Sequence, residues 1–115
     1  MNSLAELRDR LRSFAAERDW DQFHSPKNLA SALSVEAAEL LEHFQWLSEA
    51  ESKNLPPAKL AEVRDELADV LVYLVRLADK LDVNLLEAAA AKIEKNAVKY
   101  PAAKVRGSMK KYSDY

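Results

Sequence analysis

The amino-acid sequence predicts an all-α fold, a four-helix bundle, on three observations. Of its 115 residues 49% are apolar, and glycine occurs once and proline four times, so the glycine-rich turns that join strands are scarce. Good helix formers, namely Ala, Leu, Glu and Lys, dominate the composition. Apolar residues recur at helical spacing, and no segment of useful length alternates between apolar and polar residues as a strand does. Four helices around one core is the architecture that this pattern favours.

The ends of the predicted helices carry local capping signals. Four helices are expected over residues 3–18, 25–46, 58–80 and 84–100. Ser3 begins a Ser-x-x-Glu capping box, and Ser25 followed by Pro26 is typical of a helix N-terminus. Asn84 also precedes a Glu by three residues, and Pro101 ends the last helix because the residue before a proline avoids the α conformation. These local signals therefore predict where the helices begin and where the last one ends.

The length of the chain is that of one domain, residues 1–115. The linker over residues 48–57 is polar and ends in two prolines, so it is expected to be a loop. Residues 19–25 form an aromatic-rich loop, and residues 102–115 form a basic tail that contains the only glycine.

The charge balance and composition exclude several classes of protein. The formal net charge is −2, so nothing in the overall balance draws the protein to nucleic acid or to an anionic membrane. No apolar run approaches the roughly 20 residues of a membrane span, and the N-terminus does not resemble a signal peptide. Without cysteine, disulfide scaffolds and thiolate metal sites are excluded. A soluble cytoplasmic protein is expected.

Two acidic pairs, Glu36 with Glu39 and Glu66 with Asp69, are spaced i, i+3 within predicted helices. The first pair lies inside an apolar stripe, where an unneutralised charge is strongly disfavoured. The second lies on the flank of its stripe. The first stripe consists of Leu29, Leu33, Leu40 and Leu47, and the second of Val63, Leu67, Val70, Leu74 and Leu77. Four carboxylates directed toward one bundle interior repel one another, so a divalent metal is the simplest partner for them.

The donor set indicates which metal this is. Oxygen ligands without His or Cys favour a hard cation, Mg²⁺ or Mn²⁺, over zinc. A di-iron carboxylate bundle requires Glu-x-x-His, whereas His43 follows Glu39 by four positions, so that motif is absent. The alternative is that both pairs lie on ordinary solvated helix faces, which fits Glu66 and Asp69 better than it fits Glu36 and Glu39.

Two further groups of residues are candidates for binding a phosphorylated ring compound. Lys92, Asn96 and Lys99 are spaced i, i+4, i+7 and form one polar edge with Tyr100 close to it, so they offer charge and hydrogen bonds to phosphate. An ordinary solvated face is the alternative. The aromatic candidates for a pocket around a planar ring are Trp20, Phe23, His24, Trp46 and Tyr73, and simple core packing is the alternative for each.

These patterns together resemble a known family. Glu-x-x-Glu, a gap of 26 residues and Glu-x-x-Asp are similar to the all-α nucleoside triphosphate pyrophosphohydrolases, the MazG-like superfamily, and closest to its dCTP pyrophosphatase branch. The resemblance runs from about Asp19 to Asp114. Four further segments are similar to motifs of that branch, in its order: Arg18–His24, Glu42–Trp46, Asp69–Tyr73 and Arg106–Tyr112.

The resemblance implies a role for each group of residues. The four carboxylates would bind Mg²⁺, and the phosphate and base sites would be formed by the two other groups. The phosphate group is Lys92, Asn96, Tyr100 and Lys99, and the base group is Trp20, His24, Trp46 and Tyr73. Some base contacts would come from a neighbouring subunit, because the family implies a homo-oligomer, commonly a tetramer of paired dimers.

The expected reaction is hydrolysis of a deoxynucleoside triphosphate at the α–β bond to the monophosphate and pyrophosphate, which removes unwanted nucleotides. Glu36 or Glu39 is expected to be the general base, since an apolar setting raises a carboxyl pKa, and Lys92 to stabilise charge developing on phosphate. One rival is a non-catalytic helical protein that binds nucleotide or mediates oligomerisation. Another is the same enzyme with a different base, such as dUTP or a modified dCTP.

Overall fold

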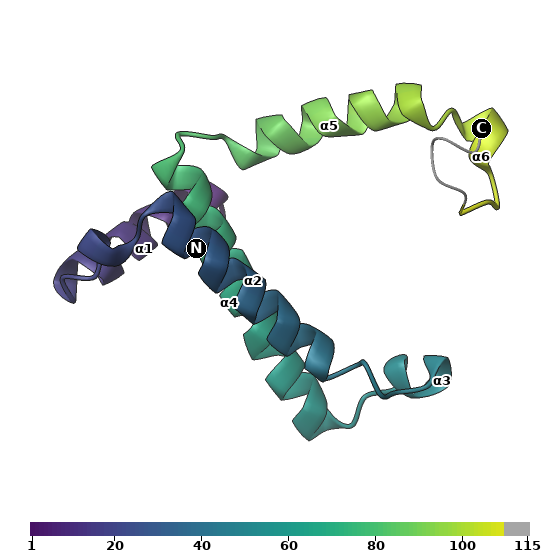
Figure 1. Ribbon diagram of the computed structural model, residues 1–115, viewed down its shortest axis with the longest axis horizontal. Coiled ribbons are helices and arrows are strands. Elements are labelled where there is room, and N and C mark those ends of the chain that lie inside the picture. The colour runs from purple at the N-terminus through teal and green to yellow at the C-terminus, as the bar shows by residue number, and fades with distance from the viewer. Residues whose placement is uncertain (110–115) are drawn as a thin grey trace. The chain divides into compact units, whose positions relative to one another are not determined.

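The computed structural model describes residues 1–109 and contains no strand within that range (Figure 1). The all-α prediction is therefore confirmed for the described part of the chain. The elements are, in order, α1 (Leu4–Glu17), the 3-10 helix η1 (Asp21–Phe23), α2 (Pro26–Glu42), α3 (Glu49–Ser52), α4 (Pro57–Lys80), α5 (Leu85–Lys99) and α6 (Ala102–Val105). They divide into two compact units, one of residues 1–82 and one that begins at residue 83.

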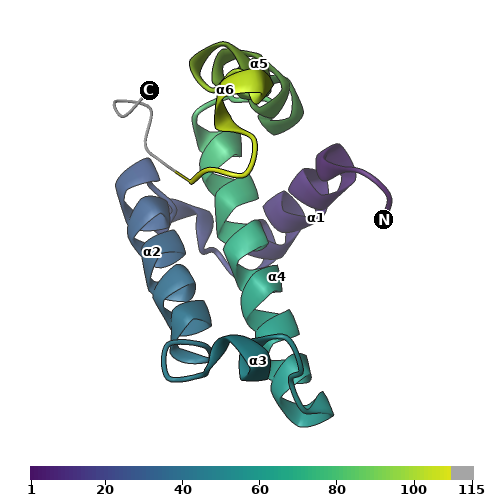
Figure 2. The ribbon, with the colours of Figure 1, turned by 90° about the vertical axis from the view of Figure 1, so that its right-hand side faces the viewer.

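The first unit is built on the pairing of α2 with α4. The two helices run antiparallel, since His43 at the end of α2 contacts Lys59 near the start of α4 (Nδ1 to Nζ, 3.0 Å), while His24 just before α2 contacts Arg76 near the end of α4 (Nδ1 to Nη2, 3.1 Å). Helix α1 also packs against α4, and Figure 2 shows α1 and α2 flanking it.

The apolar core of this unit is small. Leu29 is 1% exposed and is the largest side chain buried to that extent among the described residues. The buried apolar residues of the described part are Ala15, Leu29, Val63, Val75 and Ala78. Leu67 and Leu74, which belong to the predicted apolar stripe of α4, are instead 53% and 37% exposed. Part of that stripe is therefore not covered within one chain.

The three predicted N-cap residues each cap their helix, but the predicted capping box at Ser3 is incomplete. The Ser3 hydroxyl accepts a hydrogen bond from the backbone N–H three residues on (3.1 Å), as do the Ser25 hydroxyl (3.2 Å) and the Asn84 amide oxygen (3.0 Å). Only half of the capping box at Ser3 is present, because the Glu6 carboxylate accepts from the N–H of Asn2 (3.1 Å). Each cap satisfies one N–H that lacks a helical partner.

The second helix ends earlier than the sequence predicted, at Glu42 and not at Trp46. The N–H groups of Phe44 (2.9 Å) and Gln45 (2.8 Å) both bond to the carbonyl of Leu41. The Gln45 bond is that of a regular helix, but the N–H groups of Phe44 and Leu47 bond only three residues back (both 2.9 Å). This tightening of the last turn leaves Trp46 in the connection between α2 and α3.

The prediction of four helices was too low, because the described residues contain six α-helices. The four long ones were expected, whereas α3 lies within the predicted 48–57 loop and α6 within the predicted tail. A complete capping box between Ser48 and Glu51 starts α3 (Oγ to N, 3.1 Å; Oε1 to N, 2.9 Å). The Ser-x-x-Glu pattern of this box is present in the sequence, so α3 has the same local signal as the other capped helices. Lys110, Lys111 and Tyr112 of the predicted tail motif lie outside the described residues.

The second unit contains α5 and α6. Every residue of α5 after Leu85 is exposed, including Leu86 (67%), Ile93 (65%) and Val98 (83%). Among residues 1–109 no helix has the length and the apolar character that crossing a lipid bilayer requires.

Candidate metal and nucleotide site

Three of the four predicted acidic residues come together between α2 and α4. One carboxylate oxygen from each of Glu36, Glu39 and Glu66 lies within 4.8 Å of the other two. All three side chains are partly buried. The i, i+3 spacing places the two α2 carboxylates one turn apart on the same face, and the antiparallel pairing brings Glu66 of α4 opposite them.

The cluster lacks internal compensation for its negative charge. Oε2 of Glu36 and Oε2 of Glu66 are buried without a hydrogen-bond partner. Burial, hydrogen bonds to Glu39 and Glu66, and the charges of Glu39 and Asp69 raise the pKa of Glu36 from 4.5 to about 7. Protonating one carboxyl relieves part of this repulsion, and a bound divalent cation would relieve more of it.

Asp69, the fourth predicted ligand, is exposed and lies outside the group of three. Its charge nevertheless contributes to the raised pKa of Glu36, so it is close enough to act on the site. The donors are all carboxylate oxygens, and two of them are buried and unpaired. This set fits a hard divalent cation, which binds oxygen ligands and keeps some positions open for water or phosphate.

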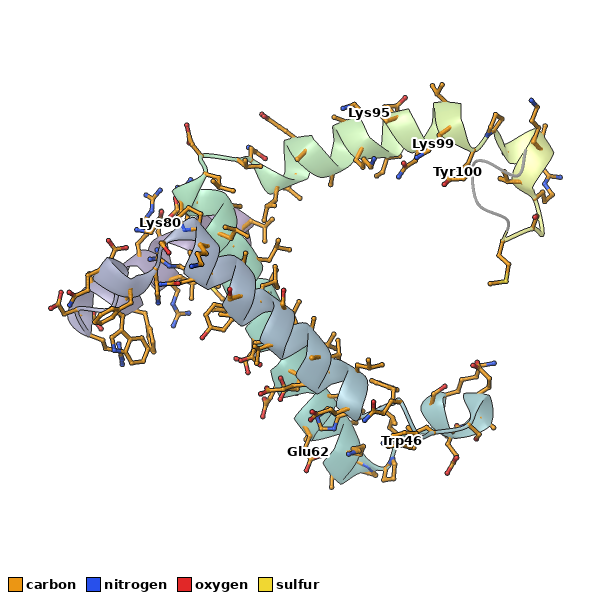
Figure 3. All side chains as sticks on the ribbon, in the orientation of Figure 1. Trp46, Glu62, Lys80, Lys95, Lys99 and Tyr100 are labelled. Atoms are coloured by element: carbon orange, nitrogen blue, oxygen red, sulfur yellow. The ribbon has the colours of Figure 1, made fainter. Side chains whose placement is uncertain are left out.

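The predicted base-binding aromatic residues do not form one pocket within the protomer. Trp20 is 47% exposed and packs edge-to-face on Phe14, with ring centroids 5.9 Å apart. Tyr73 is partly buried on α4, one turn beyond Asp69. Trp46 is 86% exposed. It lies beyond the C-terminal end of α2, whereas Lys80 marks the opposite end of the α2–α4 pair (Figure 3).

Trp20 and Trp46 are therefore separated by the whole of α2. Its 17 residues span about 25 Å at the helical rise per residue. One base cannot contact both rings of the same chain. The fourth predicted base residue, His24, uses its Nδ1 to accept hydrogen bonds from Arg76, and its contact with a base stays a prediction.

The predicted phosphate-binding residues all belong to the second unit, which is described by itself. Lys92, Asn96 and Lys99 are exposed on α5, and Figure 3 shows Lys95 and Lys99 along the same helix. The ammonium of Lys99 lies 5.8 Å from the ring centroid of Tyr100. Their role toward phosphate therefore stays a prediction.

The sequence did not predict one charged cluster, which is centred on Arg76. This residue is 3% exposed and is the one buried charged residue of the described part. Its guanidinium contacts Asp21, His24 and Asp79. The only hint in the sequence was an arginine within the apolar run that ends α4. His43, for which no role was predicted, contacts Lys59 and Glu62 at the other end of the pair.

Comparisons with known proteins give one consistent result. The sequence profile of the MazG-like family matches residues 31–115. The dCTP pyrophosphatase 1 of Mus musculus is 46% identical over 114 residues, which are 97% of this chain and 67% of the mouse protein. The human dCTP pyrophosphatase 1 is 43% identical over the same shares. The crystal structure of a pyrophosphatase from Archaeoglobus fulgidus superposes with a TM-score of 0.80 and 48% identity, covering 84% of this chain and 91% of that one.

Proposed function

Because this chain belongs to the MazG-like family, we propose that it hydrolyses dCTP between the α- and β-phosphates, giving dCMP and pyrophosphate. The observation that carries the proposal is the cluster of Glu36, Glu39 and Glu66 with its two unpaired buried oxygens. The identity of 43% and 46% to dCTP pyrophosphatases over nearly the whole chain supports the choice of cytosine. The cellular role is removal of unwanted nucleotides, and the chain acts as a single cytoplasmic domain.

The proposed cofactor is Mg²⁺, with Mn²⁺ as the alternative ion. Glu36, Glu39 and Glu66 hold it, with Asp69 as a further ligand on the exposed side. When bound, the ion neutralises the carboxylates, polarises the phosphate and lowers the pKa of bound water. Oxygen-only ligands and an open side support this choice over zinc.

Different residues of the chain accept the proton, stabilise the developing charge and hold the phosphates. A carboxylate of the cluster, Glu36 or Glu39, accepts a proton from the attacking water. The water oxygen forms a bond to the α-phosphorus while the bond from that phosphorus to the bridging oxygen breaks. Pyrophosphate departs with the electron pair of this bond. Lys92 stabilises the charge that develops on the phosphates, and Asn96, Lys99 and Tyr100 hold them in place.

The base is held by aromatic residues from two copies of the chain. Trp20, His24 and Tyr73 come from one copy, and Trp46, at the far end of α2, comes from another. An exposed leucine stripe on α4 supports such an assembly, because its members share one side of the helix at 100° per residue. The stripe consists of Leu60, Leu67, Leu71 and Leu74, which are 54%, 53%, 40% and 37% exposed.

Light scattering coupled to size-exclusion chromatography is expected to give four times the chain mass of 13.0 kDa, as for the proposed tetramer. Apolar surface of this extent is buried in a stable protein. Leu67→Glu, which places a charge in the leucine stripe, should lower the measured mass. Ala61→Glu, at an exposed position on the same helix about 120° away from Leu67, serves as the control. A wild-type mass of 13.0 kDa contradicts the assembly.

Wild-type protein with Mg²⁺ is expected to convert dCTP to dCMP and pyrophosphate, measured by separating the nucleotides chromatographically and assaying pyrophosphate. A panel with dUTP, a methylated dCTP and the other deoxynucleoside triphosphates decides the base preference. Release of inorganic phosphate in place of pyrophosphate contradicts cleavage at the α–β bond. Binding without turnover of any nucleotide favours the rival, a non-catalytic nucleotide-binding protein.

A further inference from the structure

Arg76 of α4 is a charged side chain in a buried position, which is unusual because charged groups are costly to remove from water. Only 3% of the residue is exposed, and it lies in the run Val75-Arg-Leu77, between two apolar side chains. A guanidinium without partners is costly to bury, and removing one partner of a buried pair is strongly destabilising. The contacts of Arg76 therefore indicate what the burial achieves.

The contacts of Arg76 reach mainly to one short segment, residues 20–24. Its Nη2 donates to Asp21 Oδ1 at 2.9 Å and lies 3.1 Å from His24 Nδ1, and its Nε donates to the same His24 nitrogen at 3.3 Å. Lys80 adds a second contact to Asp21 Oδ1 at 2.6 Å. The guanidinium of Arg76 thus binds both Asp21, the first residue of η1, and His24, the residue just after it. The whole 3-10 turn is therefore attached to α4.

The third partner, Asp79, belongs to a different connection. It lies 3.7 Å from Arg76 Nη1, but its main partner is Arg12 of α1, whose Nε donates to Asp79 Oδ2 at 2.7 Å. Arg12 makes no contact with residues 20–24 among its hydrogen bonds and ion pairs. Arg12 therefore attaches α1 to α4, and Arg76 attaches the 20–24 segment.

This segment begins with Trp20, whose direction depends on how the turn is attached. The chain leaves α1 through Asp19, which has a left-handed backbone (φ 55°), and the N–H of Trp20 bonds to the carbonyl of Ala15 (2.9 Å). The ring is nearly half exposed, and among the aromatic rings of residues 1–109 it packs on Phe14 alone. Packing alone does not enclose it, so the polar contacts on either side determine where it lies.

The attachment point also lies on the side of α4 that carries the candidate site. Glu66, Asp69, Tyr73 and Arg76 are spaced by 3, 4 and 3 residues, so they share one face of the helix. Docking the 20–24 segment at Arg76 consequently sets the position of Trp20 relative to Tyr73 and the acidic cluster.

We propose that Arg76 is a positioning residue for nucleotide recognition: it holds residues 20–24 against α4 so that the Trp20 ring is in place before the base arrives. This rests on the proposed function, in which Trp20 contacts the base. Ordering the ring in advance lowers the entropy lost on binding. Because Trp20 is remote from the reacting phosphorus, Arg76 acts on substrate binding and leaves the chemical step unchanged.

Arg76→Lys tests the proposal, since lysine keeps the charge but has no planar fork to hold Asp21 and His24 together. The KM for dCTP is expected to rise about tenfold with kcat within about twofold. In a Trp46→Phe background Trp20 is the sole tryptophan, and its emission should shift to the red and lose anisotropy when Lys replaces Arg76.

Arg12→Lys is the matched control, because it makes the same exchange in the neighbouring ion pair. It should lower the melting temperature without changing KM or Trp20 emission. An unchanged KM and emission in Arg76→Lys, or an equal rise of KM in Arg12→Lys, would overturn the proposal. If Arg76→Lys does not fold, Asp21→Asn replaces it with the same expected direction. A wild-type chain without turnover counts against the proposed function alone, and Trp20 emission then decides the positioning role by itself.

Discussion

Glu36→Gln is expected to lower turnover of dCTP by about 100-fold or more and, at the same time, to raise the melting temperature of the metal-free protein at pH 8. The two effects have one cause. The variant loses a carboxylate that the proposed site needs for the cation and for accepting a proton. It also loses the charge whose repulsion by Glu39 and Asp69 opposes the metal-free fold.

The opposite signs distinguish a functional carboxylate from a structural one. A Glu that merely stabilised the fold would, when replaced, lower the melting temperature together with activity. Oε2 of Glu36 has no hydrogen-bond partner, so replacing the carboxylate by the amide of glutamine removes no hydrogen bond at that atom. Steady-state kinetics and thermal unfolding with a chelator present measure both quantities on the same preparation.

Asp65→Asn is the matched control, because it exchanges a carboxyl for an amide at the position next to Glu66, where the residue is exposed. It should leave turnover within about twofold, as exposed surface changes usually do. If Glu36→Gln retains wild-type turnover, or destabilises the metal-free protein, the assignment of the acidic cluster as the metal site is wrong.

Binding of Mg²⁺ is expected to release about one proton per ion near pH 6 and almost none above about pH 8. The released proton is that of Glu36, whose pKa is raised to about 7 by burial and by the neighbouring carboxyl groups. Below that pH the ion must displace it, so the apparent affinity falls up to tenfold for each pH unit. Calorimetric titration in buffers of different ionisation enthalpy measures the proton directly.

The same carboxyl predicts how the stability of the metal-free protein depends on pH. Its pKa is about 7 in the fold against 4.5 for an unperturbed glutamate, so between these values the folded state binds more protons than the unfolded state. The contribution of this group to stability is therefore complete below about pH 4.5 and is lost as the pH rises through about 7. Saturating Mg²⁺ should reverse that loss, giving a thermal shift that grows with pH.

Glu36→Gln is the control for both measurements, since it has no proton at this position to release. Any heat of Mg²⁺ binding that remains in the variant should show no buffer dependence, and its metal-free stability should change less between pH 5 and about 7.5. Wild-type protein that binds Mg²⁺ with no proton release at pH 6 would contradict the raised pKa of Glu36.

Local features of the fold were predictable from the sequence because local interactions determine them. Ser3, Ser25 and Asn84 cap helices in the structure as the capping patterns predict, since a cap involves residues three apart in the chain. The capping box that starts α3, at Ser48, obeys the same rule and could have been found in the same way. The early end of α2 could not, because residues 43–47 contain no glycine or proline and the change to hydrogen bonds three residues back is visible only in the structure.

The acidic site was predictable for a different reason. A carboxylate within an apolar stripe is an anomaly that the sequence itself displays, and helical spacing states which acids share a face. The structure joins Glu36 and Glu39 with Glu66 but leaves Asp69 exposed, because the side-by-side pairing of α2 and α4 sets which turns face each other. The base residues belong to elements far apart in the chain, and Trp20 and Trp46 form no joint pocket within one protomer, because the whole of α2 separates them.

The sequence by itself determined the all-α class, the long helices, the acidic cluster and the family, because each depends on composition, short-range spacing or motifs read along the chain. Only the tertiary structure decided which carboxylates meet, that Trp20 and Trp46 lie at opposite ends of one helix pair, and that Arg76 is buried against residues 20–24. Residues 21 and 76 are far apart in the chain, and an ion pair between them exists only once η1 and α4 are packed together. A buried charge is explained by its partners, and the sequence cannot name those partners before the helices are placed.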